Sequence, residues 1–176
     1  MIDVFERAFC GEYISSGYYS RVYELKGDNT KVVKIGDCSY GTSFGDSDAT
    51  RDYLEAIHKG YIEEEFTPVV HEFVDTSMYF QKRGSARPYL CVMDKYRPAS
   101  CREYNVSELK TKLESMKKKL QIQGCEMDLH SANIMMNEKG KAIVIDPFAM
   151  GTNRPRTTML LNKRVPVRSL TQYTRI

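Results

Sequence analysis

Hydrophobic and polar positions alternate along the first third of the chain in the way that is typical of β-strands. The alternation is clearest at residues 21–25 and 31–35, which are separated by the turn-forming triplet Gly27-Asp28-Asn29. A shorter segment, residues 12–14, precedes them. The pattern predicts three strands of a small antiparallel sheet.

Two later segments have the spacing of amphipathic helices. The first is expected from Ala49 to His58, capped by Ser47 or Asp48, and the second from Glu108 to Ile122, capped by Ser107. The apolar positions that form their buried faces are Tyr53, Leu54, Ile57, Leu109, Leu113, Met116 and Leu120.

Further strands are predicted on either side of a basic loop at residues 82–88. One covers residues 66–74 and is entered through Pro68. The other, residues 89–93, is apolar throughout and is expected to be central and buried on both faces. Residues 94–98 follow it as a hinge, and residues 36–45 form a polar loop rich in Gly and Ser.

A β-hairpin near residue 140 brings candidate catalytic groups together. Residues 134–136 and 142–145 are expected to pair across a turn at residues 137–140, which places Asn133 and Asp146 at the same end. Phosphoryl transfer needs a carboxylate to orient the attacking hydroxyl and oxygen ligands for Mg²⁺. Asp128 fits the first role, and Asn133 with Asp146 fits the second. The alternative is an ordinary hairpin with a solvated Asp and a turn Asn.

The spacing of Asp128, Asn133 and Asp146, with the wording Asp-Leu-His-Ser-Ala-Asn-Ile-Met and Asp-Pro, resembles the protein-kinase-like superfamily. The wording looks closest to the early serine/threonine kinases of podoviral bacteriophages, and the DxHxxN form also occurs in aminoglycoside and choline kinases. Glu126 and Met127 stand where many kinases carry His and Arg, and Asp146-Pro147-Phe148 replaces Asp-Phe-Gly.

The resemblance implies ATP and Mg²⁺ as cofactors and assigns further residues to them. Lys34 would bind the α- and β-phosphates, beneath a loop centred on Gly17. The helix at residues 49–58 would offer a carboxylate to Lys34, with Glu55 favoured over Asp52. The residues expected to line the nucleotide are Gly17, Ser20, Val22, Lys34, Glu55, Met93, Asp94 and Tyr96. Lys34 could instead be an edge-strand lysine that keeps the sheet soluble, and Met93 could simply belong to the core.

The fold class expected is therefore α+β, a minimal two-lobed protein-kinase-like fold. Residues 1–96 would form an N-lobe with an antiparallel sheet, one helix and the hinge. Residues 97–150 would form a truncated C-lobe with the catalytic and metal-binding loops, and residues 151–176 a basic tail.

Composition and charge indicate the expected location and partners of the protein. Five cysteines without a C-x-x-C pair, no apolar run of about 20 residues and no signal-peptide pattern favour a cytoplasmic protein, in the host cytoplasm if it is phage-encoded. From Phe148 onward there is no Asp or Glu but there are six basic residues, so the chain's net charge of +3 is concentrated in the tail. The tail could bind an acidic partner. Nucleic acid is the less favoured partner because no aromatic-basic groove accompanies the tail.

The function favoured is that of a serine/threonine protein kinase acting on host proteins. A small-molecule phosphotransferase is one alternative, suggested by the DxHxxN wording. A non-catalytic kinase-fold protein that binds and inhibits a partner is the other, suggested by the short C-lobe.

Overall fold

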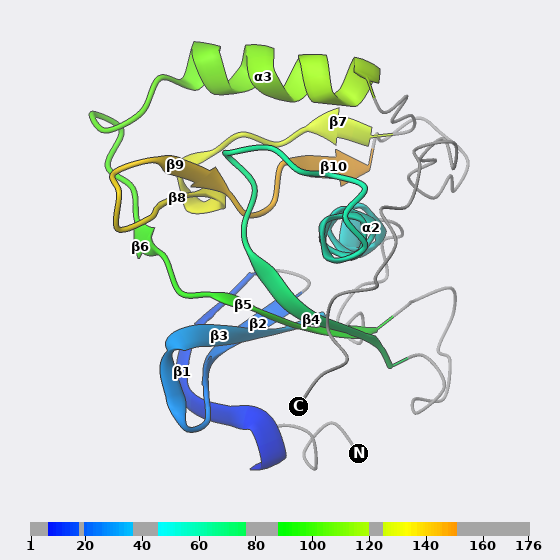
Figure 1. Cartoon of the computed structure of the whole chain (residues 1–176), viewed down its shortest axis with the longest axis vertical. Coiled ribbons are helices and arrows are strands. Elements are labelled where there is room, and N and C mark those ends of the chain that lie inside the picture. Colours follow the sequence, from blue (N-terminus) through cyan, green and yellow to red (C-terminus); the bar gives the residue numbers. More distant parts are fainter. Residues whose placement is uncertain (1–6, 18–19, 37–45, 77–87, 120–124, 151–176) are drawn as a thin grey trace, which may run out of the picture.

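The computed structural model describes residues 7–17, 20–36, 46–76, 88–119 and 125–150. Predictions made for residues 37–45, 82–87 and 151–176, and for Leu120, lie outside these ranges. The described part is an α+β structure, as the sequence predicts, with an antiparallel sheet below and helices and short strands above it (Figure 1).

A five-stranded antiparallel sheet has the order β1-β2-β3-β5-β4. Its strands are β1 (Cys10–Ser16), β2 (Ser20–Leu25), β3 (Asp28–Gly36), β4 (Val70–Asp75) and β5 (Tyr89–Asp94). β5 lies between β3 and β4 and is buried over its first five residues, which confirms the prediction of a central strand. The prediction for β4 was wrong at its start. The strand begins at Val70 because Pro68 has no N–H to donate and Phe66 packs into the core instead.

A glycine is required where β3 ends. Gly36 lies opposite Tyr89 in the register of β3 and β5, and a Cβ atom on Gly36 would lie 2.1 Å from the Tyr89 ring. Only a residue without a side chain lets the ring lie across the strand there.

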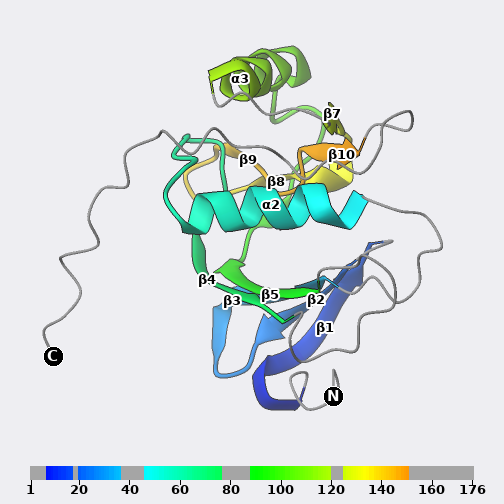
Figure 2. The same ribbon diagram turned by 90° about the vertical axis from the view of Figure 1, so that its right-hand side faces the viewer.

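Helix α2 (Asp46–His58) lies between the five-stranded sheet and the short strands above it (Figure 2). It begins at Asp46, before the capping residues that the sequence suggests. Helix α3 (Val106–Lys119) lies on the far side of the short strands and buries Leu109, Leu113 and Met116 as predicted. In the described part of the molecule no helix has the length and apolar character needed to cross a membrane.

The short strands form two further small sheets. β8 (Ile134–Met136) and β9 (Ala142–Val144) make the predicted antiparallel hairpin, whose turn contains Gly140 with φ of 71°. β6 (Arg97–Pro98) pairs with β8, so the second half of the expected hinge is a strand. β7 (Cys125–Met127) pairs with β10 (Phe148–Met150), and neither of these strands was predicted.

One hydrophobic core runs through all of these layers. It includes Val32 of β3, Tyr53 of α2, Leu113 of α3, Val144 of β9 and Phe148 of β10. The core therefore crosses the expected lobe boundary at residue 96. A smaller cluster lies on the other side of the sheet, formed by Val33, Ile35, Leu90 and Val92. Because neighbouring strand residues face opposite sides, Lys34 lies on the same side as Val32, which is the side of α2.

Candidate functional site

Lys34 lies near the C-terminal end of β3, between Val22 of β2 and Cys91 of β5. It is buried, with 5% of its surface exposed. An ammonium group removed from water needs a countercharge. Its Nζ atom is 3.3 Å from Oδ2 of Asp146, a residue 112 positions later in the chain. Lys34 is therefore part of an internal ion pair, which rules out the alternative of a solvated edge-strand lysine.

Asp146 stands between β9 and β10 and is held through both carboxylate oxygens. Oδ2 pairs with Lys34, and Oδ1 accepts a hydrogen bond from Oγ1 of Thr50 on α2. The carboxylate is thus fixed by two elements that come from the N-terminal half of the chain. Sequence reasoning did not single out Thr50.

Asn133 connects the loop of Asp128 to the segment that carries Asp146. It ends the short 3₁₀ helix η1 (Ser131–Asn133), and its backbone oxygen accepts a hydrogen bond from Ile145 N at 2.9 Å. Its side-chain Nδ2 donates to the backbone oxygen of Asp128 at 2.9 Å, and Asp128 N donates to Pro147 O at 2.9 Å. The hairpin therefore places Asn133 beside the Asp146 segment, as predicted, and the loop of Asp128 is bonded to both.

The side chain of Asp128 is half exposed, at 46%, and its neighbour is His130. Nδ1 of His130 accepts a hydrogen bond from Ala132 N at 3.2 Å, so the neutral ring carries its proton on Nε2. That Nε2 atom lies 3.7 Å from Oδ2 of Asp128. In the sequence this histidine stood out only as part of the DxHxxN form. Its position two residues after Asp128 was the available signal.

Glu55 is not brought to Lys34, which corrects the expectation for the helix carboxylate. Its Oε2 accepts from Arg51 at 2.8 Å and its Oε1 from Lys59. Burial acts to raise the pKa of the Glu55 carboxyl, but the hydrogen bond from Lys59 and the charges of Arg51 and Lys59 outweigh it and lower the pKa. The reason is local, since Arg51, Glu55 and Lys59 follow one another at intervals of four, the first two on α2 and Lys59 directly after its last residue.

Arg51 is itself a buried residue that the sequence did not indicate. It is 4% exposed, lies over the Phe73 ring with its guanidinium carbon 5.5 Å from the centroid, and donates to Asp75 of β4 at 2.7 Å. Asp52 is also buried and lies 3.1 Å from Arg51. This cluster joins α2 to the edge of the sheet.

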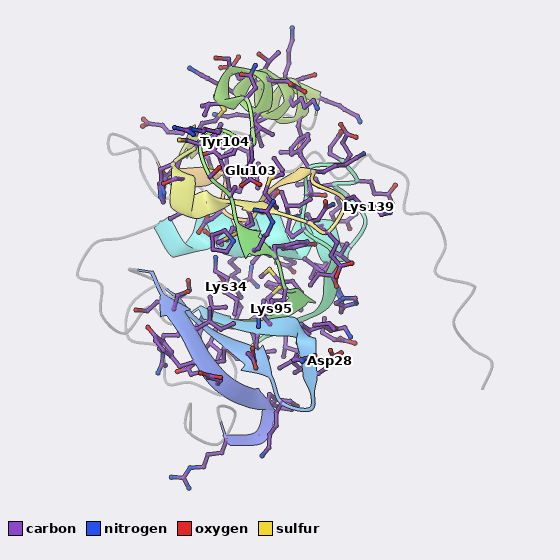
Figure 3. All side chains as sticks on the ribbon, turned by 90° about the vertical axis from the view of Figure 1, so that its left-hand side faces the viewer. Asp28, Lys34, Lys95, Glu103, Tyr104 and Lys139 are labelled. Atoms are coloured by element: carbon purple, nitrogen blue, oxygen red, sulfur yellow. The ribbon has the colours of Figure 1, made fainter. Side chains whose placement is uncertain are left out.

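The last residue of β5 and the two residues after it are tied to other strands of the sheet. Asp94 N donates to Val69 O at 3.2 Å, and an Asp94 carboxylate oxygen is 2.7 Å from Nε2 of His71. Lys95 N donates to the backbone of β3 at 2.8 Å, and its side chain pairs with β2. Tyr96 Oη accepts from Val69 N at 2.9 Å. Figure 3 shows Lys95 and Lys34 on the sheet side of the molecule, with Glu103 and Tyr104 towards α3.

The remaining residues expected near the nucleotide lie directly after β1, on β2 and on β5. Gly17 N donates to the backbone oxygen of Ser20, the first residue of β2, at 2.9 Å. A Cβ atom on Gly17 would meet only Ser20 Oγ, at 3.8 Å, so the described fold does not itself require a glycine there. Val22 and Met93 both pack in the main core, so a structural role is enough to explain Met93.

The oxygen atoms of the site suit a hard cation such as Mg²⁺, which takes only some of its ligands from the protein. No group of three or more His, Cys, Asp or Glu side chains in the described ranges could hold a metal. Asp146 and Asn133 offer a carboxylate and an amide oxygen, because Nδ2 of Asn133 is already used in its bond to Asp128. Mg²⁺ is commonly bound by one or two such protein groups together with phosphate oxygens and water. The residues present fit that mode.

A cavity of about 240 Å³ lies elsewhere, at the start of α3. Its wall contains Glu65, Lys112 and Lys141, in which the carboxylate pairs with both lysines. None of the predicted site residues lines it. The wall also carries Glu103 and Glu108, so its carboxylates outnumber its lysines and it suits phosphate groups less well than the Lys34–Asp146 site.

The cysteine next to Lys34 is expected to resist thiol reagents. Burial raises the pKa of Cys91 to about 12, although the charge of Lys34 acts in the opposite direction. At pH 8 only about 10⁻⁴ of a thiol with that pKa is thiolate, the reactive form. Cys101 is exposed, so iodoacetamide should modify it first and Cys91 at least ~100-fold more slowly. Mass spectrometry of the labelled peptides measures both rates, and equal rates would contradict the buried position.

In comparisons with known proteins, no family model matches this chain and no curated protein matches it either.

Proposed function

We propose that this protein is an ATP- and Mg²⁺-dependent phosphotransferase of the protein-kinase-like type, acting on serine and threonine hydroxyls of proteins. The observation that carries the proposal is the ion pair between Lys34 and Asp146, at 3.3 Å, with Asn133 and Asp128 bonded to the same segment. Asp128, Asn133 and Asp146, which were proposed from their spacing, thus belong to one segment, and Lys34, which the resemblance implied, pairs with Asp146 of that segment.

The antiparallel sheet with one helix against it, followed by a hinge-like connection, supports a minimal kinase-like fold. Lys34 comes from the sheet, and the other three residues come from loops around β8, β9 and β10. A site at such a junction has one wall that can bind nucleotide phosphates and another that can present a catalytic carboxylate.

Each residue has a defined task in this proposal. Lys34 would bind phosphate oxygens with its ammonium group. Asp146 and Asn133 would hold Mg²⁺ through their oxygens, and the ion supplies charge neutralisation at the phosphates when bound. Asp128, with its exposed carboxylate, would orient the attacking hydroxyl and accept its proton.

Burial explains why a nucleotide with its metal suits this site. The ammonium of Lys34 is largely removed from water, and its countercharge is the carboxylate of Asp146. A phosphate group would supply a new partner for Lys34, and a cation would supply one for Asp146. The buried charges would therefore remain compensated after the pair separates.

Replacing Asp146 by alanine should abolish Mg²⁺-dependent binding of ATP. A ligand at 100 times its Kd stabilises a folded protein by about 2.7 kcal/mol, or roughly 5–10 °C in Tm for a chain of this size. We expect that rise for the wild type with ATP and Mg²⁺, and none for Asp146→Ala. Glu138→Ala, which changes an exposed carboxylate in the β8–β9 turn, is the control and should behave as the wild type. Absence of a rise in the wild type would contradict the proposal.

Transfer itself is tested with γ-labelled ATP and a cytosolic protein extract, followed by phosphoamino-acid analysis. Label on serine and threonine supports the proposed substrate class. Stabilisation by ATP without label on protein would redirect the proposal to small-molecule acceptors.

A further inference from the structure

Helix α2 reaches the candidate metal-binding carboxylate through a hydroxyl group. Thr50 is 6% exposed, and its Oγ1 donates to Oδ1 of Asp146. The other oxygen of that carboxylate pairs with Lys34. Because each oxygen has its own partner from a different element, the plane of the carboxylate is fixed as well as its position.

A second side chain of α2 holds the backbone around Asp146. Tyr53 lies three residues after Thr50 and therefore on the same side of the helix. It is fully buried, its Oη donates to Val144 O at 2.9 Å, and its ring meets the Phe148 ring edge to face with centroids 5.9 Å apart. Burial raises the pKa of Tyr53 well above its usual value, and the Asp146 charge adds to this, so the phenol remains a proton donor.

Val144 and Phe148 stand two residues before and two residues after Asp146. The helix therefore contacts the metal-binding segment at three successive points: the backbone before Asp146, its carboxylate, and the ring after it. Figure 2 shows α2 lying along these strands with the sheet on its other side.

On the sheet side, α2 is anchored by an arginine. Arg51 is buried and donates to Asp75 of β4 at 2.7 Å while its guanidinium lies over Phe73. Arg51 thus fixes the helix to the sheet, and Thr50 and Tyr53 fix it to the Asp146 segment. The helix therefore sets the position of the Asp146 segment relative to the sheet.

We propose that Thr50 and Tyr53 are the positioning residues of this site: they hold Asp146 in the orientation in which it binds the cation. This rests on the proposed function, in which Asp146 is a metal ligand. The helix thus acts on the metal-binding aspartate through a neutral hydroxyl, while its carboxylate Glu55 is engaged by Arg51 and Lys59. A hydroxyl that donates to a carboxylate orients it without adding a charge that would repel or replace the cation.

The test compares Thr50→Val, which keeps the shape and removes the hydroxyl, with Thr50→Ser, which keeps the hydroxyl. Thr111→Val is the matched control, because Thr111 is also helical and its Oγ1 donates to Ser107 O at 2.9 Å, on α3. The first readout is the Mg²⁺ concentration that half-saturates ATP binding. Loss of a group that orients a metal ligand typically weakens metal affinity by about 10–100-fold. We expect an increase of about tenfold for Thr50→Val, recovery in Thr50→Ser, and no change in Thr111→Val or in Mg²⁺-free nucleotide binding.

The second readout needs no ligand. Hydrogen exchange of the peptide that contains residues 142–150 should be at least about threefold faster in Thr50→Val and in Tyr53→Phe than in the wild type and Thr111→Val. Tyr53→Phe keeps the ring and removes only the hydrogen bond to Val144. It therefore still tests the contact between α2 and the Asp146 segment if Thr50→Val does not fold.

The two readouts separate the possible failures. An unchanged Mg²⁺ requirement in a folded Thr50→Val protein that binds ATP would overturn the positioning role. A wild type without Mg²⁺-dependent ATP binding would overturn the proposed function and the cation part of this inference. In that case faster hydrogen exchange in Thr50→Val and Tyr53→Phe would still establish that α2 holds the Asp146 segment. Unchanged hydrogen exchange would show that α2 does not hold it.

Discussion

Replacing Asp128 by asparagine is expected to lower the rate of phosphoryl transfer by about 10²–10⁴-fold, the range that a positioned general base contributes. Binding of ATP and Mg²⁺ should stay within about twofold of the wild type. The side chain of Asp128 is half exposed and faces His130, whereas the bonds to Pro147 and Asn133 use its backbone. The variant therefore keeps the loop geometry and loses only the proton acceptor.

Single-turnover transfer from γ-labelled ATP measures this effect, and thermal shifts measure binding. Glu126→Gln is the matched control, since Glu126 is an exposed carboxylate on β7 only two residues away. Full activity in Asp128→Asn would show that the catalytic carboxylate has been misplaced. Loss of binding together with activity would assign Asp128 to the nucleotide or metal instead.

Truncating Leu113 to alanine is expected to lower the free energy of unfolding by about 2–5 kcal/mol, the usual cost of a buried leucine-to-alanine change. Leu113 has no exposed surface and packs in the core that also contains Val32, Tyr53 and Phe148. Because that core links α3 to the five-stranded sheet, we expect a single unfolding transition that moves as a whole.

Urea unfolding followed by tyrosine fluorescence gives this value, since the chain has 12 tyrosines and no tryptophan. Val106→Ala on the same helix is the control. Val106 is 46% exposed, so its truncation should change stability by no more than about 0.5 kcal/mol. A biphasic transition in Leu113→Ala, with the sheet unfolding later, would mean that the two halves are separate cooperative units.

The regular elements could be predicted because their signals are local. The apolar run of β5, the turn before β3 and the single buried face of α3 are each visible within a few residues. Strands β7 and β10 could not be predicted. Each has three residues, too few for a periodicity, and they pair only because the chain returns through the β8–β9 hairpin.

In the candidate site, too, the features with local sequence signals could be predicted. The spacing of Asp128, Asn133 and Asp146 indicated that they would meet, and hydrogen bonds join Asn133 to Asp128 and both of them to the neighbours of Asp146. The partner of Lys34 was not predictable, because it depends on how the segment between β9 and β10 packs against the sheet. A signal against Glu55 was nevertheless present in its neighbours Arg51 and Lys59, which lie at spacings that favour pairing along the helix.

The ion pair between Lys34 and Asp146 affects whether a phosphate group and a cation would bind separately or together. A phosphate alone would take Lys34 and leave the carboxylate without its partner, and a cation alone would leave the buried ammonium without its own. Under the proposed function, nucleotide and metal arriving together would satisfy both groups. Their affinities would then be linked, each ligand strengthening the other by the same factor. In that proposal the site favours the metal–nucleotide complex over either component on its own.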